Sequence, residues 1–198
     1  RKCHINRNLT TGVCNNTSSI KVARSALHYF EEPSISGSNG SGTIFFSGCN
    51  LKCCYCQNKE ISTNNFGINI SIKRLSELML ELQSKKANNI NLVTPTHFVP
   101  SIIEAIKLAR ENGLTIPIVY NTSGYESVDT IKLLDGYVDI YLTDFKYFDN
   151  KLGEDLSKVK NYFEVASAAL DEMYKQVSKN KFSSNGLIFY HIWLVYCL

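Results

Sequence analysis

Four cysteines lie within eight residues of one segment. Of all the residue groups in the sequence, this one has the side chains and the spacing best suited to bind a metal. Cys49, Cys53 and Cys56 are spaced C-x3-C-x2-C, and Cys54 stands outside that spacing. Three thiolates on one loop can bind three irons of a cubane [4Fe–4S] cluster, because soft sulfur ligands select iron–sulfur clusters or zinc over hard cations. No fourth ligand is evident in the loop, so one iron of such a cluster would stay open to a small molecule.

Other interpretations of the cysteines stay open at this point. The thiols could be adventitious, or they could hold a structural zinc ion, although zinc normally needs a fourth ligand to close its tetrahedron. We expect Cys54 to be a packed free thiol, and Cys3 and Cys14 to be either free thiols or members of an N-terminal cysteine group. Seven cysteines are an odd number, and four of them are clustered, which suits a metal or redox centre in a reducing cytoplasm better than a disulfide framework.

The sequence from Thr43 onward predicts alternating strands and helices, and these elements must position the cysteines. Short runs of β-branched and aromatic residues predict strands at 43–47, 89–94, 116–120, 138–142 and 187–196. Apolar residues spaced by three and four predict helices at 72–82, 99–112 and 126–134, and two more between 156 and 177 that separate near Asn161. Strands and helices that alternate in this way predict an α/β fold with a mostly parallel sheet.

The number of predicted strands limits the architecture. Five strands cannot complete an eight-stranded barrel, so we expect a partial barrel or an open doubly wound sheet. Both place their sites where strands end, which here means the loops 48–58, 94–98, 121–125 and 143–148. Residues 1–42 show no sustained period and are interpreted as a lead-in segment that contains Cys3 and Cys14, followed by a core at 43–198.

The composition argues against two classes of partner. With 21 basic and 18 acidic residues among 198, the formal charge is +3, which is no basic surplus of the kind that marks a nucleic-acid binder. The longest apolar run, Leu187 to Leu198, is shorter than the roughly 20 residues that cross a bilayer. We therefore expect neither a nucleic-acid partner nor a membrane.

The cysteine loop resembles that of the radical S-adenosylmethionine (SAM) enzymes. The shared features are the C-x3-C-x2-C spacing, Tyr55 just before the third cysteine, and a position after the first strand of a βα series. The wider sequence is similar to the branch related to pyruvate formate-lyase activating enzyme, and the likeness runs from about Cys3 to about Ile188. It is carried by the stretches GTIFFSGCNLKCCYCQN (42–58), NLVTPTH (91–97), VYNTSGY (119–125) and DIYLTDFK (139–146).

This resemblance implies a partial βα barrel of the radical SAM type with a [4Fe–4S] cluster on Cys49, Cys53 and Cys56. The amino and carboxylate groups of SAM would chelate the open iron. One electron would then cleave the sulfonium to give methionine and a 5′-deoxyadenosyl radical that abstracts a hydrogen atom. The resemblance also implies an electron donor such as flavodoxin or ferredoxin, and as substrate either a glycyl-radical protein or a small molecule.

Contacts with SAM are implied by the same resemblance. The stretch from Asn91 to Thr96 occupies the place where the family's strand end holds the SAM amino group, although the family's Gly-Gly-Glu sequence is absent. Asn121 and Thr122 resemble an Asp-Thr pair near SAM and a monovalent cation, without the carboxylate charge. Lys146 would pair with the SAM carboxylate. The full set of expected cofactor contacts is Tyr55, Asn91, Thr94, Asn121, Thr122, Asp144 and Lys146.

Other interpretations of single residues and of the whole chain remain beside this hypothesis. His97 either faces the substrate or is a solvated loop residue, and Asp144 and Lys146 could form a surface ion pair. The chain departs from the family's pattern after Ile188 and is interpreted as truncated after about five strands. The alternative function is a non-catalytic iron–sulfur or zinc-binding module, which could also be an inactive fragment.

Overall fold

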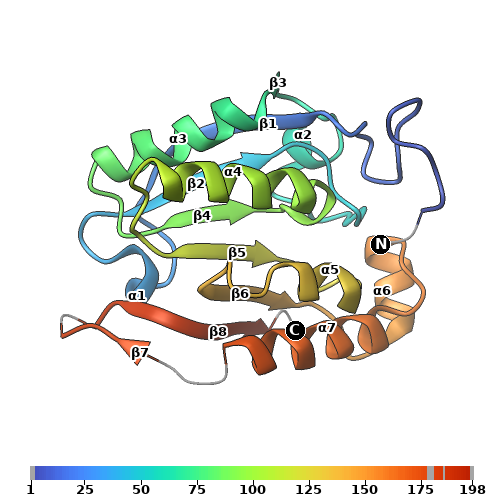
Figure 1. Ribbon diagram of the computed structural model, residues 1–198. Coiled ribbons are helices and arrows are strands. Elements are labelled where there is room, and N and C mark those ends of the chain that lie inside the picture. Colours follow the sequence, from blue (N-terminus) through green and yellow to red (C-terminus); the bar gives the residue numbers. More distant parts are fainter. Residues whose placement is uncertain (1–2, 178–180, 185, 197–198) are drawn as a thin grey trace.

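One open sheet forms the centre of the computed structural model, which describes residues 3–177, 181–184 and 186–196 (Figure 1). Its strand order is β3-β1-β2-β4-β5-β6-β8-β7. The five central strands are parallel, and they follow one another across the sheet in chain order. They are β2 (Ser41–Phe46), β4 (Ile90–Val93), β5 (Ile118–Thr122), β6 (Ile140–Phe145) and β8 (Ile188–Tyr196). The predicted α/β fold with a partial, unclosed barrel is confirmed.

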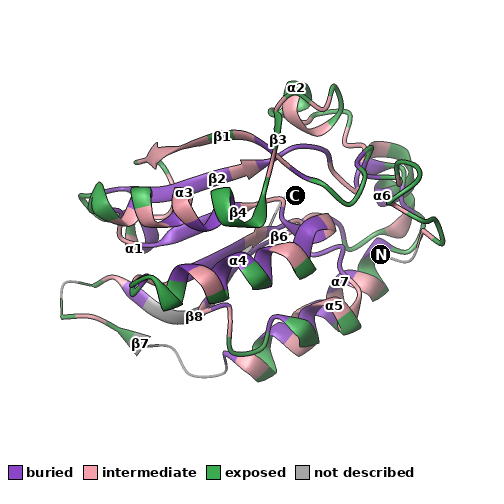
Figure 2. Cartoon of the chain, turned by 45° about the horizontal axis from the view of Figure 1, so that its top comes forward, coloured by how far each residue is buried: buried purple, intermediate pink, exposed green. Residues whose placement is uncertain are grey.

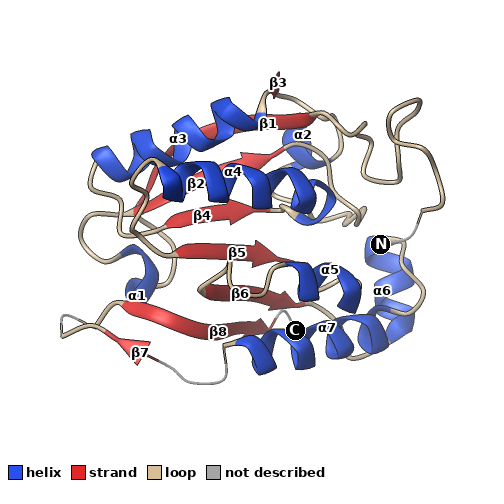
Figure 3. Ribbon diagram, viewed as in Figure 1, coloured by secondary structure: helices blue, strands red, loops and turns tan. Residues whose placement is uncertain are grey.

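Helices connect the parallel strands, and the larger ones cover one face of the sheet (Figures 1 and 3). The apolar stripe of the predicted first helix forms α3, in which Leu75, Met79 and Leu82 are buried and the Ser71 hydroxyl caps the N-terminus by accepting from Arg74 N. The last amphipathic segment divides into two helices near Asn161, as predicted. The helices of this layer are α3 (Ile72–Ser84), α4 (Val99–Glu111), α5 (Val128–Leu133) and α7 (Tyr162–Gln176).

The central strands are largely buried (Figure 2), and alternation along them sends successive side chains to different faces of the sheet. On β4, Leu92 packs in the main core beneath the helices, whereas its neighbour Asn91 points to the opposite face. On β5 and β6, Tyr120 and Tyr141 likewise belong to that core. The opposite face has Asn91 on β4, Asn121 on β5 and Asp144 on β6 near the carboxyl ends of the strands.

Two antiparallel strands flank the parallel series at one edge of the sheet, and neither was predicted from the sequence. Within the residues interpreted as a lead-in, β1 (Ile20–His28) pairs with β2. The short β3 (Ile68–Ile70) then pairs with β1 at the sheet edge. A register shift between Val22 and Arg24 breaks the alternation of apolar residues in β1, which removes the pattern by which a strand is recognised.

Shorter elements complete the chain. They are α1 (Pro33–Ser36), α2 (Lys59–Ser62), the 3-10 turn η1 (Thr96–Phe98), α6 (Asn150–Ser157) and β7 (Lys181–Phe182). Of these, α2, η1 and α6 lie toward the carboxyl ends of the parallel strands (Figure 1). None of the helices in the described part of the chain combines the length and apolarity needed to cross a bilayer.

Candidate metal and cofactor site

The cysteine loop begins at the carboxyl end of β2 and is fixed there by a tight turn. Gly48 has φ +80, a left-handed conformation that favours glycine. Its amide donates to the Ile61 carbonyl at 2.9 Å. Beside it, the Asn16 side chain donates to the carbonyls of Ser47 and Cys14 at 2.8 and 3.1 Å. The N-terminal segment therefore holds the start of the loop against the sheet.

The middle of the cysteine loop is held by the end of α6. The Lys52 amide donates to the Ser157 carbonyl at 3.0 Å, and the Cys54 amide donates to the Leu156 carbonyl at 2.9 Å. Leu51 packs in a second apolar cluster together with Tyr125 and Tyr162, which Cys49 and Cys53 border. A segment about 100 residues away in sequence thus fixes the backbone between the first and third cysteines.

The three sulfurs of the spaced motif are free and half-buried. The pKa of the Cys49 thiol is raised to about 11, mainly by burial and also by the nearby Cys53 and Cys56 thiols, although the Leu51 amide opposes this. A buried thiol of this kind becomes a thiolate when a bound metal compensates the charge, and this donor set fits an iron–sulfur cluster. Among the described residues no three or more His, Cys, Asp or Glu side chains converge as ligands of one metal ion. In a cubane each thiolate binds a different iron, so such convergence is not required.

A row of hydroxyl groups leads to the Cys53 sulfur. Ser157 is fully buried and donates from Oγ to Cys53 Sγ at 2.9 Å. Its Oγ lies 2.6 Å from the Tyr147 hydroxyl, which in turn contacts the Tyr55 hydroxyl. Each hydroxyl has one proton, so donation by Ser157 to sulfur requires Tyr147 to donate to Ser157 and Tyr55 to donate to Tyr147. We call Tyr55, Tyr147 and Ser157 the hydroxyl row.

Two neighbours in the loop differ from the motif cysteines in their exposure. Cys54 was expected to be a packed thiol, but it is exposed, because the bonded loop backbone turns its side chain outward. Tyr55 is also exposed over much of its ring, although its hydroxyl joins the hydroxyl row. Cys56 instead has the Ser62 hydroxyl of α2 3.1 Å from its sulfur.

Some of the expected SAM contacts share the polar face of the sheet. Asn91 is fully buried, and neither its amide oxygen nor its amide nitrogen forms a hydrogen bond of good geometry. On the next strand, Asn121 opposes Val93, the residue two places beyond Asn91 and on the same face. Thr94 follows with φ +58 and donates its amide to the Asn121 carbonyl at 3.0 Å. The Asn91 amide contacts the Glu31 carboxyl only in a geometry short of a good hydrogen bond, so it fits a site that a polar ligand completes.

Thr122 lies on the other face of β5 and does not join these residues. Its hydroxyl donates to Glu126 Oε1 at 2.6 Å, and the Thr96 hydroxyl donates to the same oxygen at 2.6 Å. Glu126 is buried, and burial raises its pKa. The structure therefore separates Thr122 from Asn121, since consecutive residues of a strand point to opposite faces.

Asp144 and Lys146 form an ion pair, which was one of the two interpretations of these residues. Lys146 Nζ lies 3.0 Å from Asp144 Oδ2, with the lysine side chain 13% exposed and the aspartate side chain 37% exposed. Asp144 lies in β6 near its carboxyl end, and Lys146 directly follows the strand. A largely buried ammonium group at this position suits a carboxylate ligand.

His97 is packed and was not expected to be. Its Nε2 lies 2.7 Å from the Ser47 carbonyl, and its buried Nδ1 has no hydrogen-bond partner among the described residues. The pKa of the imidazole is lowered to about 4, mainly by burial and further by the Arg7 and Lys52 charges, although the bond to Ser47 opposes this. His97 is therefore a neutral side chain that ties η1 to the end of β2.

Three polar residues near the site, Ser157, Tyr147 and Glu31, were not predicted from the sequence. Glu31 precedes α1, and burial raises its pKa while the nearby Asn91 amide lowers it. No spacing motif connects any of these residues to the cysteines, because the sheet and α6 bring them there from distant parts of the sequence. For Ser157, the only signal was its place in the last predicted helical segment.

Comparison with known proteins agrees with this geometry. Residues 43–191 match the family model of the radical SAM superfamily, whose members use a [4Fe–4S] cluster and SAM. The chain is also similar to "Uncharacterized protein MJ0674" of Methanocaldococcus jannaschii, with 38% identity over 172 residues. The match includes 83% of this chain and 49% of that protein, so the chain spans about half the length of this relative. Since the family match extends over most of the chain, the protein belongs to the radical SAM superfamily.

Proposed function

We propose that Cys49, Cys53 and Cys56 hold a [4Fe–4S] cluster and that the chain cleaves SAM reductively. The observation that carries this proposal is the position of the C-x3-C-x2-C loop at the carboxyl end of β2, inside the segment that matches the superfamily. Catalytic sites of parallel βα folds are built from such strand ends. The raised pKa of Cys49 supports the proposal, because a bound cluster would compensate the buried charge.

When bound, the cluster supplies the electron and the open iron with which SAM is cleaved to a 5′-deoxyadenosyl radical. The chain's own residues would bind and orient SAM. Lys146 would bind its carboxylate while Asp144 holds the ammonium group in place. Asn91 and Asn121 would offer amides on the polar face of the sheet, beside the Thr94 backbone. Tyr55 would border the site from the cysteine loop.

A finer part of the proposal concerns the reaction partners. We propose that flavodoxin or ferredoxin supplies the electron, as reductants of this kind do for radical SAM enzymes. We further propose an activating-enzyme-like role, in which the hydrogen atom is taken from a glycine of a partner protein. This role rests on the resemblance of residues 42–58 and 139–146 to the activating-enzyme branch.

Cysteine substitutions test the proposal, and the loop provides its own control. Cys49→Ala, Cys53→Ala and Cys56→Ala should each abolish both cluster loading and the formation of 5′-deoxyadenosine from SAM under dithionite. Cys54→Ala removes an exposed thiol of the same loop and should leave both unchanged. Iron and sulfide are measured after anaerobic reconstitution, and 5′-deoxyadenosine by chromatography.

The outcomes separate the proposal from the alternative module. Full SAM cleavage by any of the three motif variants would refute the assignment of the ligands. A wild-type chain that loads iron and sulfide but does not cleave SAM would instead indicate a non-catalytic iron–sulfur module. Loading of zinc alone would favour a zinc module.

A further inference from the structure

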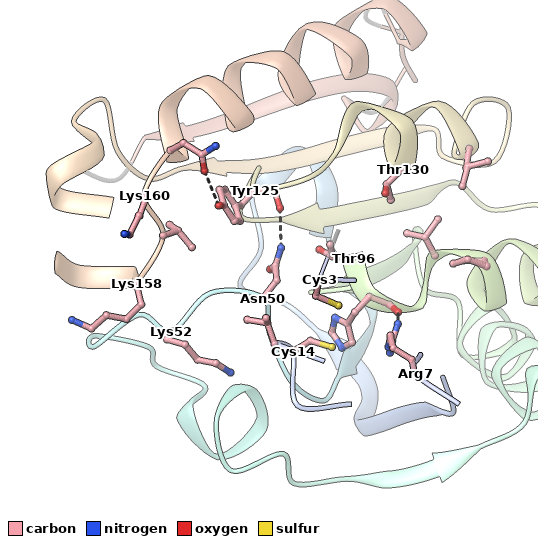
Figure 4. Close-up of a pocket in the computed structure, with 17 residues that line it drawn as sticks. Cys3, Arg7, Cys14, Asn50, Lys52, Thr96, Tyr125, Thr130, Lys158 and Lys160 are labelled. Atoms are coloured by element: carbon pink, nitrogen blue, oxygen red, sulfur yellow. Dashed lines mark hydrogen bonds between the residues drawn. The ribbon is translucent and has the colours of Figure 1, made fainter. Parts of the chain in front are cut away.

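A cavity of about 510 Å³ lies beside the cysteine loop. Thr96, at the end of the stretch expected to hold SAM, lines it, but none of the seven expected cofactor contacts does. Its walls come from the N-terminal segment, the cysteine loop, η1, the start of α4, the loop after β5, α5 and the connection between α6 and α7 (Figure 4). This volume is in the range of small-molecule sites. The side chains that give the cavity its charge and its apolar wall are Arg7, Asn50, Lys52, Val99, Leu133, Lys158, Val159 and Lys160.

The charges of the lining are all positive. Among the described residues that line the cavity, Arg7, Lys52, Lys158 and Lys160 are cationic and no Asp or Glu side chain is present. In Figure 4, Lys52 extends into the group of lining side chains, whereas the ammonium groups of Lys158 and Lys160 lie at its edge. Cationic groups at the edge and within the cavity would attract an anion inward.

These cations are only weakly compensated within the chain. Lys52 Nζ contacts the Cys49 carbonyl at 3.4 Å, and Lys158 Nζ contacts the Asp155 carbonyl at 2.8 Å. Lys160 Nζ is 3.9 Å from Glu154 in an exposed pair, which contributes little. The guanidinium of Arg7 donates to the backbone carbonyls of Asn16, His97 and Thr17, so it contributes charge while most of its donors are occupied.

A neutral histidine, apolar side chains and one amide complete the lining of the cavity. His97 also lines the cavity, and the charges of Arg7 and Lys52 lower the pKa of its imidazole beyond the effect of burial. The remaining lining includes apolar side chains, Val99, Leu133 and Val159, and the Asn50 amide, which donates to the Tyr125 carbonyl at 2.8 Å. The cavity therefore combines an apolar wall with lysines that act as point charges.

We propose that this cavity binds a small organic anion, a phosphate monoester with an apolar body. A lysine ammonium group binds phosphate as a point charge, and the two negative charges of a phosphate monoester would balance the positive charges of two lysines. The apolar wall accepts the rest of the ligand. The binding requires no cluster, because none of Cys49, Cys53 and Cys56 lines the cavity. Failure of this proposal would therefore leave the proposed function intact, and the reverse also holds.

Calorimetry with a set of matched probes tests the site. Phenyl phosphate should bind the full chain at a stoichiometry of one, with and without reconstituted cluster. Phenol and benzylamine, which keep the ring but are neutral or cationic, should show at least tenfold weaker binding. Raising sodium chloride from 50 to 500 mM should weaken the binding of phenyl phosphate, since salt screens the attraction.

Two lysine variants and one control locate the binding. Lys52→Gln and Lys158→Asn should each weaken phenyl phosphate at least about fivefold, the equivalent of about 1 kcal/mol. Asparagine tolerates the left-handed backbone of Lys158, at φ +61, so that variant should fold even if Lys52→Gln disturbs the cysteine loop. Lys151→Gln on α6 alters an exposed lysine outside the cavity and should bind like the wild type.

Three results would overturn the proposal. Phenol and phenyl phosphate could bind equally, Lys158→Asn could bind like Lys151→Gln, or SAM could displace phenyl phosphate competitively. The last result would reassign the cavity to the SAM site.

Discussion

Ser157 is the residue whose contact with a proposed cluster ligand is most direct. Its hydroxyl donates to Cys53 Sγ at 2.9 Å, and Tyr147 orients it from 2.6 Å away. Hydrogen bonds to cluster sulfurs stabilise the more negative, reduced state and so raise the reduction potential. Ser157→Ala should therefore lower the potential, by on the order of tens of millivolts, in a titration followed by electron paramagnetic resonance.

The control for this prediction is another serine on a helix end. Ser84→Ala removes a hydroxyl that is bonded only to the Glu81 carbonyl, on a surface away from the loop, and should leave the potential unchanged. Tyr147→Phe keeps the ring and should give a smaller shift in the same direction as Ser157→Ala. An unchanged potential in Ser157→Ala, with normal iron content, would show that the hydroxyl row does not affect the cluster.

His97 gives a pH dependence of stability with a defined sign. Its pKa is about 4 in the folded chain and near 6.5 when unfolded, because burial disfavours the cation. Between these values the unfolded state binds more protons at this side chain, so the contribution of His97 to the free energy of unfolding rises with pH from 4 to 6.5 and is then constant. The part that this side chain contributes is at most about 3 kcal/mol.

His97→Gln isolates this contribution. Glutamine can still donate to the Ser47 carbonyl but does not titrate in this range. Urea unfolding at pH 4.5 and pH 7 should therefore show a smaller difference for the variant than for the wild type. An equal difference in the two proteins would contradict a buried, neutral His97.

For single residues, the sequence predicted which side chains could bind a metal better than it predicted where side chains point. The cysteine motif was recognisable because its spacing is local. Cys54 and His97 were misjudged, because exposure depends on which backbone groups lie nearby, such as the Ser47 carbonyl. That Thr122 faces Glu126 and not the side of Asn121 was likewise not predicted. Ser157 could not be found, since its contact with Cys53 spans 104 residues of sequence.

At the scale of elements, the turn from β2 into the cysteine loop is the most constrained. A Cβ at Gly48 would lie 2.2 Å from the Cys14 carbonyl oxygen and 2.0 Å from Asn16 Nδ2, in a left-handed conformation. Gly48→Ala should lower the free energy of unfolding by more than about 3 kcal/mol and reduce cluster loading. Denaturant unfolding and iron analysis measure the two effects.

Gly113→Ala is the matched control for this turn. Gly113 has φ +95, but a Cβ added there would meet nothing within 4 Å, so only the backbone conformation would be strained. This variant should cost about 1 kcal/mol and leave cluster loading normal. Equal losses in the two glycine variants would mean that the contact with the N-terminal segment does not fix the loop.

The elements that the sequence predicted correctly are those in which apolar residues recur without interruption at the spacing of a helix or a strand. The stripe Leu75, Met79 and Leu82 predicted α3 together with its serine cap, and β4 and β8 fall inside their predicted ranges. The first strand, β1, escaped because its register shift interrupts the alternation. The boundaries of β5 and β6 lie about two residues further along than predicted, because pairing with neighbouring strands decides where a strand ends.

At the scale of the whole molecule, the two faces of one sheet separate structure from proposed chemistry. The helices and the main core occupy one face, and Asn91, Asn121 and Asp144 mark the other near the strand ends. The sequence predicted this arrangement in outline, since alternating strands and helices specify parallel connections. This arrangement corresponds to about half of the longer relative, since the match includes 49% of that protein.

The most direct test of the central claim is electron paramagnetic resonance of the reconstituted, reduced chain with and without SAM. The proposal predicts a [4Fe–4S]+ signal whose g-values change on addition of SAM, because the open iron takes SAM as its ligand. A signal that is indifferent to saturating SAM, from a chain with a full complement of iron and sulfide, would contradict an open iron at Cys49, Cys53 and Cys56.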